Sequence, residues 1–174
     1  MKKILILLFF VVAFSSCTEQ TKIAYVDVEE LMKEYKGTKE AEATMKVKSE
    51  SLQKELDSLI SGWQNKARIY QEKSKGLSAK VRAEREQLLM QEQQQINQRQ
   101  QAVQQQVQAE GQKSLETLSK EINDFVKNYA KEKGYNFVLG TTASNGTVMY
   151  GEEKADITDD VLVRLNKGFK AKEQ

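Results

Sequence analysis

Proline and histidine are both absent from this chain of 174 residues. At the usual frequency of ~5%, a chain of this length would hold about nine prolines. Because proline removes a helical N–H group and clashes with the preceding turn, a chain without it is suited to long, uninterrupted helices. Without histidine the chain lacks the commonest acid–base residue and the commonest metal ligand, which argues against a metalloenzyme.

Cysteine occurs only once, at Cys17, so no disulfide can form within the chain. The residues before it have the layout of a secretory signal: a basic start, an apolar run over residues 4–14, and two serines. The run of 11 residues is shorter than the ~20 that are needed to span a bilayer. We therefore expect residues 1–16 to be a signal peptide.

The position of Cys17, directly after small residues, resembles a bacterial lipobox, in which the thiol is acylated and becomes the first residue of the mature chain. Phe14 and Ser16 stand where the usual lipobox has Leu and then Gly or Ala. A free thiol would be a liability in an oxidising envelope, so lipidation explains why the only cysteine lies here. The alternative is an ordinary signal peptide with an incidental cysteine. In the lipoprotein interpretation, residues 1–16 are a lipoprotein-type signal peptide and residues 17–22 form the anchor or linker.

Charge is balanced in the expected mature chain. The full sequence holds 27 Lys and Arg against 25 Asp and Glu. Removal of the leader takes away Lys2 and Lys3, which leaves 25 basic residues against 25 acidic ones. A neutral chain does not indicate nucleic acid as a partner. Aromatic residues are only 7% of the chain, which is little material for a globular core but suits helices that bury a single seam.

A short strand is predicted at residues 23–28, which are rich in β-branched and aromatic side chains. Asp27 stands three residues before Glu30, the spacing of a helix N-cap with its capping-box acid. The strand should therefore run directly into a helix.

Two segments with a seven-residue apolar repeat, residues 31–77 and 79–133, predict long helices that pack along a seam. Gly76 suits the left-handed backbone conformation that often ends an α-helix, and Ser78 suits the N-cap of a new helix, so we expect a turn near residues 76–78. Gly134 should end the second helix. An antiparallel hairpin folded at this turn matches the two seams; one continuous helix through Gly76 is the alternative. The matched pairs are Leu59 with Ile96, Leu52 with Val103, Tyr35 with Leu118, and Leu31 with Ile122.

After Gly134 the pattern changes to two predicted strands, at residues 135–139 and 147–150, joined as a hairpin. A final helix follows, with Thr158 as its expected N-cap. The fold class is therefore α+β: residues 23–28 and 134–174 form a β-rich body with a C-terminal helix, and residues 29–133 form a coiled-coil hairpin arm.

Glutamine is concentrated at residues 87–108, where 12 of 22 residues are Gln. Glutamine is a good helix former without charge, so the simplest interpretation is a solvated helix surface.

This order of elements resembles the OmpH/Skp family of periplasmic chaperones. The resemblance is carried by "KIAYVDVEELM" at the start, "KGLSAKVRAEREQL" at the tip and "GYNFVLGTTASNGTVMYGEEKADITDDVLVRL" at the end. It implies a homotrimer in which strands from three subunits build a body and three arms surround a cavity. The cavity would hold unfolded outer-membrane proteins in the periplasm, without ATP or any other cofactor. The lipobox adds a membrane tether to this expectation.

A chaperone without an energy source must bind weakly at many points, so apolar side chains outside the seam or near the tip are the expected contacts. Local packing within the hairpin is the alternative role for each of them. The expected client-binding residues are Ile60, Ile69, Tyr70, Leu77, Leu88, Met90 and Val107. The body core, shared between subunits, is expected to contain Ala24, Val26, Val28, Phe137 and Val138.

Two other functions are open at this point. A lipid-anchored coiled-coil spacer of the cell envelope would also use long helices, but it would not need the strands and the capped helix at the chain ends. An enzyme is remote, since no local motif places a nucleophile beside a base, and we expect no metal site.

The lone cysteine at the signal boundary predicts a lipid on Cys17. The replacement Cys17→Ala should move the protein from the membrane fraction to the soluble fraction and abolish incorporation of labelled fatty acid, because the acylated thiol is gone. Cell fractionation with fatty-acid labelling measures both effects. A variant that stays in the membrane fraction would contradict the anchor.

Overall fold

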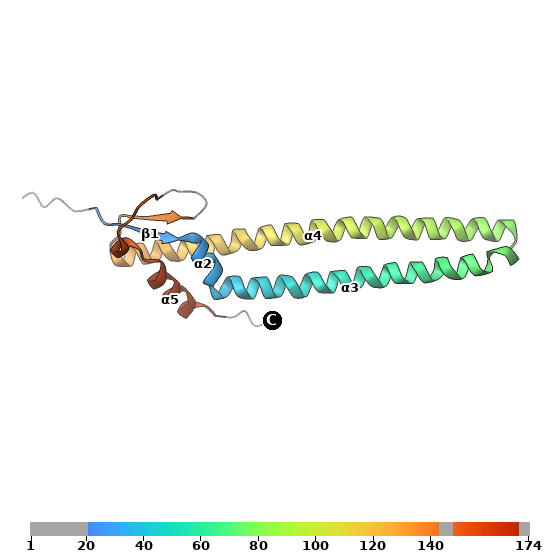
Figure 1. Ribbon diagram of the computed structural model, residues 1–174, viewed down its shortest axis with the longest axis horizontal. Coiled ribbons are helices and arrows are strands. Elements are labelled where there is room, and N and C mark those ends of the chain that lie inside the picture. Colours follow the sequence, from blue (N-terminus) through green and yellow to red (C-terminus); the bar gives the residue numbers. More distant parts are fainter. Residues whose placement is uncertain (1–20, 143–147, 171–174) are drawn as a thin grey trace, which may run out of the picture.

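A long antiparallel helical hairpin projects from a small body in the computed structural model, which describes residues 21–142 and 148–170 (Figure 1). This confirms the predicted α+β class, mostly helical with a small sheet. The predicted signal peptide and Cys17 lie outside the described residues. None of the helices in the described part combines the length and apolarity needed to cross a bilayer. The elements are, in order, β1 (Ile23–Asp27), α2 (Val28–Glu34), α3 (Lys36–Lys73), a 3-10 turn (Ser74–Gly76), α4 (Ala79–Lys133), β2 (Phe137–Thr141), a 3-10 turn (Glu153–Ala155) and α5 (Thr158–Gly168).

The sheet has two parallel strands, because β2 pairs with β1 in a register that runs from Ile23 opposite Phe137 to Asp27 opposite Thr141. The predicted hairpin between residues 135–139 and 147–150 is therefore wrong in its described part: its first strand pairs with the start of the chain, and residues 148–150 are not in a strand. Residue 147 lies outside the described residues. The reason lies at Gly151, where an added Cβ would be 2.3 Å from Cε1 of Tyr25. The chain at Gly151 therefore packs against the Tyr25 ring instead of extending the sheet.

The core lies where β1, α2, the root of α4 and α5 meet. Strand alternation turns Ala24 and Val26 into it, at 1% and 3% exposure. Val28 and Val138 are partly buried against it. Phe137 is 58% exposed and lies outside the core of the single chain, because it alternates with Val138 and pairs with the exposed Ile23 on the other sheet face. The buried core residues are Ala24, Val26, Leu31, Tyr35, Leu118, Ile122, Tyr129, Ile157, Val161 and Leu165.

The seven-residue repeat predicts one continuous helix over residues 31–77, but the structure breaks this helix at Tyr35. The Tyr35 backbone is extended there, at φ −66° and ψ 130°. The Tyr35 side chain is 1% exposed, and its hydroxyl donates a hydrogen bond of 2.5 Å to Oε1 of Glu121 on α4. Burial and this carboxylate together raise the pKa of Tyr35. The ring lies over Gly37, so burial of a large aromatic side chain outweighs continuation of the helix.

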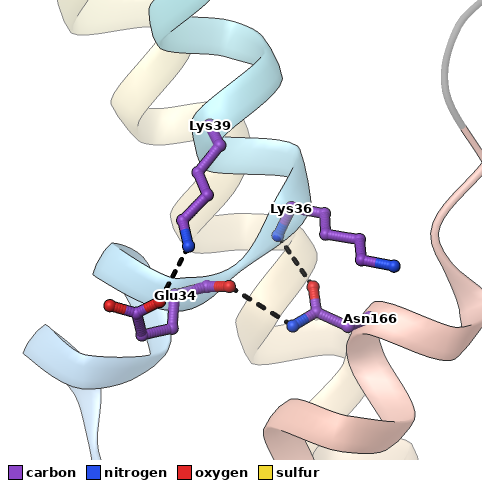
Figure 2. A network of polar contacts seen from close by, with 4 residues as sticks. All are labelled: Glu34, Lys36, Lys39 and Asn166. Carbon is purple, nitrogen blue, oxygen red and sulfur yellow. Dashed lines mark hydrogen bonds and ion pairs between the residues drawn. The ribbon is translucent and has the colours of Figure 1, made fainter.

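Asn166 of α5 satisfies the backbone groups that the break leaves unpaired (Figure 2). Its Oδ1 accepts from the N–H of Lys36 at 2.7 Å, and its Nδ2 donates to the carbonyl of Glu34 at 3.3 Å. Lys39 also reaches back across the break to the Glu34 carboxylate, at 2.7 Å. The C-terminal helix therefore holds the entry of the chain into the arm.

The helix ends follow the expected capping residues in three places. Asp27 Oδ1 accepts from the N–H of Glu30 at 3.0 Å, Ser78 Oγ accepts from the N–H of Val81 at 3.4 Å, and Gly134 has φ 70°. Gly76 was expected to be left-handed as well, but Gly134 is the only described residue with a positive φ, because a 3-10 turn closes α3.

Thr158 is also not an N-cap: it is the first residue of α5, after Ile157. Its hydroxyl instead donates to Asp156 Oδ1 at 2.6 Å and accepts from the N–H of Asp27 at 2.9 Å. The hydroxyl thus joins the end of β1 to the start of the last helix, a role that a local capping pattern does not reveal.

Gly37 is predicted to be required by the break. A Cβ there would lie 2.4 Å from Cε1 of Tyr35, so Gly37→Ala should lower the free energy of unfolding by ~1–3 kcal/mol through overpacking. Gly62→Ala on α3 is the matched control, since nothing lies within 4 Å of its added Cβ. That change should raise stability by up to ~1 kcal/mol through helix propensity. Urea unfolding followed by circular dichroism, at one protein concentration, measures both; equal effects would contradict the role of Gly37.

The Tyr129–Asp160 contact predicts a pH dependence. The Tyr129 hydroxyl, with Arg164, lowers the pKa of Asp160, and burial first and Asp160 second raise the pKa of Tyr129 to about 12. A lowered carboxyl pKa adds stability above its ordinary value of 3.8, and that stability is lost as the pH falls. Tyr129→Phe should therefore destabilise the protein less at acidic than at neutral pH. Tyr135→Phe, on the ring stacked against Tyr129, is the control. A pH-independent loss in Tyr129→Phe would contradict this linkage.

Candidate functional site

Most apolar side chains along the seam of the arm are in contact with solvent on at least one side. Between residues 39 and 117 the buried hydrophobic side chains are Leu56 and Val103. Leu59 is exposed, and Trp63 and Ile96 are half-buried, although all three lie on the predicted seam. The arm consists of two helices side by side (Figure 1), which cannot surround a side chain between them, so it exposes apolar surface along its length.

Polar contacts hold the two helices in register. Arg99 contacts both carboxylate oxygens of Glu55, at 3.1 and 2.9 Å, which is the register predicted from a turn at residues 76–78. The indole N–H of Trp63 donates to the carbonyl of Leu89 at 2.9 Å, and Lys66 pairs with Glu92 at 2.7 Å. Because the ion pairs are exposed, each contributes only ~0–1 kcal/mol, so they fix the register more than the stability.

A groove of about 430 Å³ lies between α3 and α4 next to the tip. Four of the expected client-binding residues meet in it: Ile69, Tyr70, Leu77 and Leu88. Its apolar lining is completed by Val81 and Leu89. The Tyr70 hydroxyl is held by Glu86 at 2.5 Å, and this hydrogen bond raises the pKa of Tyr70.

The other three expected residues lie apart from this groove. Met90 is 61% exposed on α4, one residue beyond the lining. Ile60 and Val107 are half-buried farther toward the body. They offer contact points along the arm but do not form one site with the tip.

A second groove of about 430 Å³ lies in the middle of the arm, lined by Leu59, Trp63 and Ile96 among others. Sequence reasoning missed it because these residues were assigned to the closed seam. The signal was present at Gly62, which lines the same groove and leaves space beside Trp63.

The tip is locally basic even though the mature chain is expected to be neutral. Residues 73–85 hold five Lys or Arg and one Glu. Within the described residues, no ion pair involves Lys73, Lys75, Lys80 or Arg85. Lys73 and Arg85 line the tip groove, so an apolar segment with an acidic neighbour would fit there.

The body carries a separate apolar surface on the sheet face that points away from the core. Ile23, Phe137 and Leu139 are exposed on it, at 51%, 58% and 41%. Met149 and Tyr150 of the body are also largely exposed. In the described ranges, no group of three or more His, Cys, Asp or Glu side chains is placed to hold a metal ion. The geometry therefore offers binding surfaces, with apolar side chains as their main chemistry.

Comparison with known proteins assigns this architecture. The family model described as outer membrane protein (OmpH-like) matches residues 22–165. No curated protein sequence matches the chain. The crystal structure of a protein from Caulobacter crescentus CB15, proposed as an OmpH-like outer membrane chaperone, superposes with a TM-score of 0.78. The two chains share 18% sequence identity, and the match covers 89% of each, so the likeness shows the fold.

Proposed function

Because this chain belongs to the OmpH-like family of outer membrane proteins, we propose that it is an ATP-independent holdase chaperone that binds unfolded outer-membrane proteins in the periplasm. The observation that carries this proposal is the open arm, whose apolar side chains meet in grooves near the tip and in the middle. Many weak contacts on such an arm would hold an unfolded chain without selecting one sequence. Dispersed contacts also add up through avidity.

The proposal includes a homotrimer. A two-stranded sheet is too small to be stable with one face exposed to water. The exposed Ile23, Phe137 and Leu139 would be covered if the bodies of three subunits packed their sheets together. Phe137 and Val138 would then contribute to a shared core, with three arms around a cavity for the client.

The membrane tether is the other part of the proposal. The described chain begins next to the body, where the N–H of Lys22 donates to Oδ1 of Asn136 at 2.7 Å. A lipid on Cys17 would therefore lie a few residues from the body, at the end of the molecule opposite the tip. The body would face the membrane, and the arms would extend into the periplasm.

A spacer lipoprotein is the second candidate, and the length of α4 favours it. Its 55 residues extend over ~80 Å, enough to bridge part of the envelope. A spacer has no use for apolar grooves at its free end, so those grooves favour the chaperone.

Client binding is predicted to depend on the tip groove. The combined replacement of Ile69, Tyr70 and Leu77 by Ser should weaken binding of an unfolded β-barrel protein by about tenfold or more, because burial of apolar surface gives ~25 cal/mol per Å². Trp63, the only tryptophan of the chain, can report binding of a client without tryptophan by its fluorescence. A parallel measurement is the protection of the client from aggregation without nucleotide.

The matched control replaces Val47 and Leu115 by Ser, since both are exposed apolar residues outside the tip groove. This variant should bind like the wild type, and circular dichroism should show unchanged helix content in both variants. Affinity should also change little up to ~0.5 M salt, because salt screens ion pairs but does not weaken apolar contacts. A steep loss with salt, with no effect of the triple replacement, would assign recognition to the tip cations instead.

A further inference from the structure

The middle of α4 is almost free of charge, unlike its two ends. Residues 87–108 hold two charged side chains among 22, whereas residues 79–86 hold five among eight and residues 109–133 hold ten among 25. Over the same 22 residues the sequence places 12 glutamines. We call residues 87–108 the glutamine band; at 1.5 Å per residue it extends over ~33 Å of the arm.

Both charges of the band are used between the helices. Glu92 pairs with Lys66 of α3 at 2.7 Å, and Arg99 binds both carboxylate oxygens of Glu55. They lie three residues from Leu89 and Ile96 respectively, on the side that faces α3. The outward face of the band therefore presents no charged group of its own.

The glutamine side chains themselves are available for hydrogen bonding. Eleven of the twelve are exposed, and Gln106 is half-buried. Gln106 donates to Glu110 at 3.0 Å; within the described part of the chain, the other eleven have no side-chain partner. A glutamine carboxamide carries the same N–H donors and C=O acceptor as a peptide group, so this face is an array of free, neutral amides.

The chemistry of the face selects its partner. Nucleic acid or an anionic membrane would need cations, which the outward face lacks. Packing of a second copy of the helix would need an apolar stripe, and the exposed large hydrophobics of the band are Leu88 and Met90 at its tip end. A partner that carries closely spaced neutral donors and acceptors remains, and the main chain of an unfolded polypeptide is that partner.

We propose that the outward face of the glutamine band binds the main-chain amide groups of the unfolded client, an inference that rests on the proposed function. The tip and middle grooves take apolar side chains, while the band engages N–H and C=O groups that every client residue carries. Such binding is independent of client sequence. A client segment whose main chain is engaged in this way cannot pair as a strand with another segment, which is how unfolded β-barrel chains aggregate.

The test replaces four outward glutamines by charges that keep the helix and the net charge: Gln94→Glu, Gln98→Lys, Gln101→Glu and Gln105→Lys. All four are exposed, and each Glu precedes its Lys by four residues, the order that stabilises a helix. The control places Asn at the same four positions, which retains the carboxamides. The probes are an unfolded β-barrel protein, without nucleotide, and an apolar peptide in two forms of the same sequence, one unmethylated and one N-methylated along its main chain.

The charged variant should bind the unfolded β-barrel protein about fivefold more weakly than the wild type, because Glu and Lys side chains must give up charge hydration to reach neutral main-chain groups, and the Asn variant should stay within about twofold. The N-methylated peptide keeps its carbonyl acceptors but lacks main-chain donors, so the difference in affinity between the wild type and the charged variant should be smaller for it than for the unmethylated peptide. Equal binding of the unfolded protein by wild type and charged variant would overturn this inference and leave the holdase proposal intact. A wild type that binds no client would overturn both, and a changed oligomeric state of the charged variant in sedimentation would assign the band to a contact between copies instead.

Discussion

The structure depends on the burial of the root of α4, the one element that belongs to both the arm and the body. Leu118, Ile122 and Tyr129 on this root are buried against β1, α2 and α5. Two tyrosine–carboxylate hydrogen bonds add direction: Tyr35 to Glu121 where the arm begins, and Tyr129 to Asp160 where α5 begins. Because α4 is continuous from the tip to Gly134, anchoring its last turns in the core positions the whole arm.

An arm of only two helices buries little apolar surface, so it gains little stability from its own packing but leaves its apolar side chains accessible. Its partner helix α3 contributes Leu56 to the buried seam, and α4 contributes Val103, so most apolar side chains of the arm remain in contact with water. Packing at the root offsets this loss of stability. The break at Tyr35 lets α2 turn its buried face to the core, while α3 starts in a direction that keeps it beside α4. Asn166 closes the backbone at that break, so the last helix of the chain secures the first part of the arm.

The sequence was sufficient for the features that local physical chemistry determines. The seven-residue repeat, together with Gly76 and Ser78, predicts the hairpin and its register, which Arg99 and Glu55 confirm. Features set by contacts distant in the chain were not predictable in this way. β2 pairs with β1 across more than a hundred residues, and Tyr35 breaks its helix because Glu121 and Gly37 accommodate its ring. For the candidate site, the hydrophobic character of Ile69, Tyr70, Leu77 and Leu88 was readable. That they line one groove, and that Trp63 lines another, required the two helices to be placed side by side.

The balanced charge expected for the mature chain conceals a strong segregation of charge along α4. Within the described residues, Lys and Arg side chains without an ion pair gather at the tip, the outward face of the glutamine band behind it carries no charge, and charged residues return toward the body. In water, exposed ion pairs contribute little to stability, so this arrangement is not needed to hold the helices together. It does control what approaches each part of the arm. A cationic tip raises the rate at which acidic segments within the ~8–10 Å screening length encounter it, without setting the affinity, whereas a neutral amide face neither attracts nor repels by charge and binds whatever main chain is already near. Under the proposed holdase function, an unfolded chain that reaches the tip would next meet surfaces along the arm that do not discriminate between sequences, which suits a holdase with many clients.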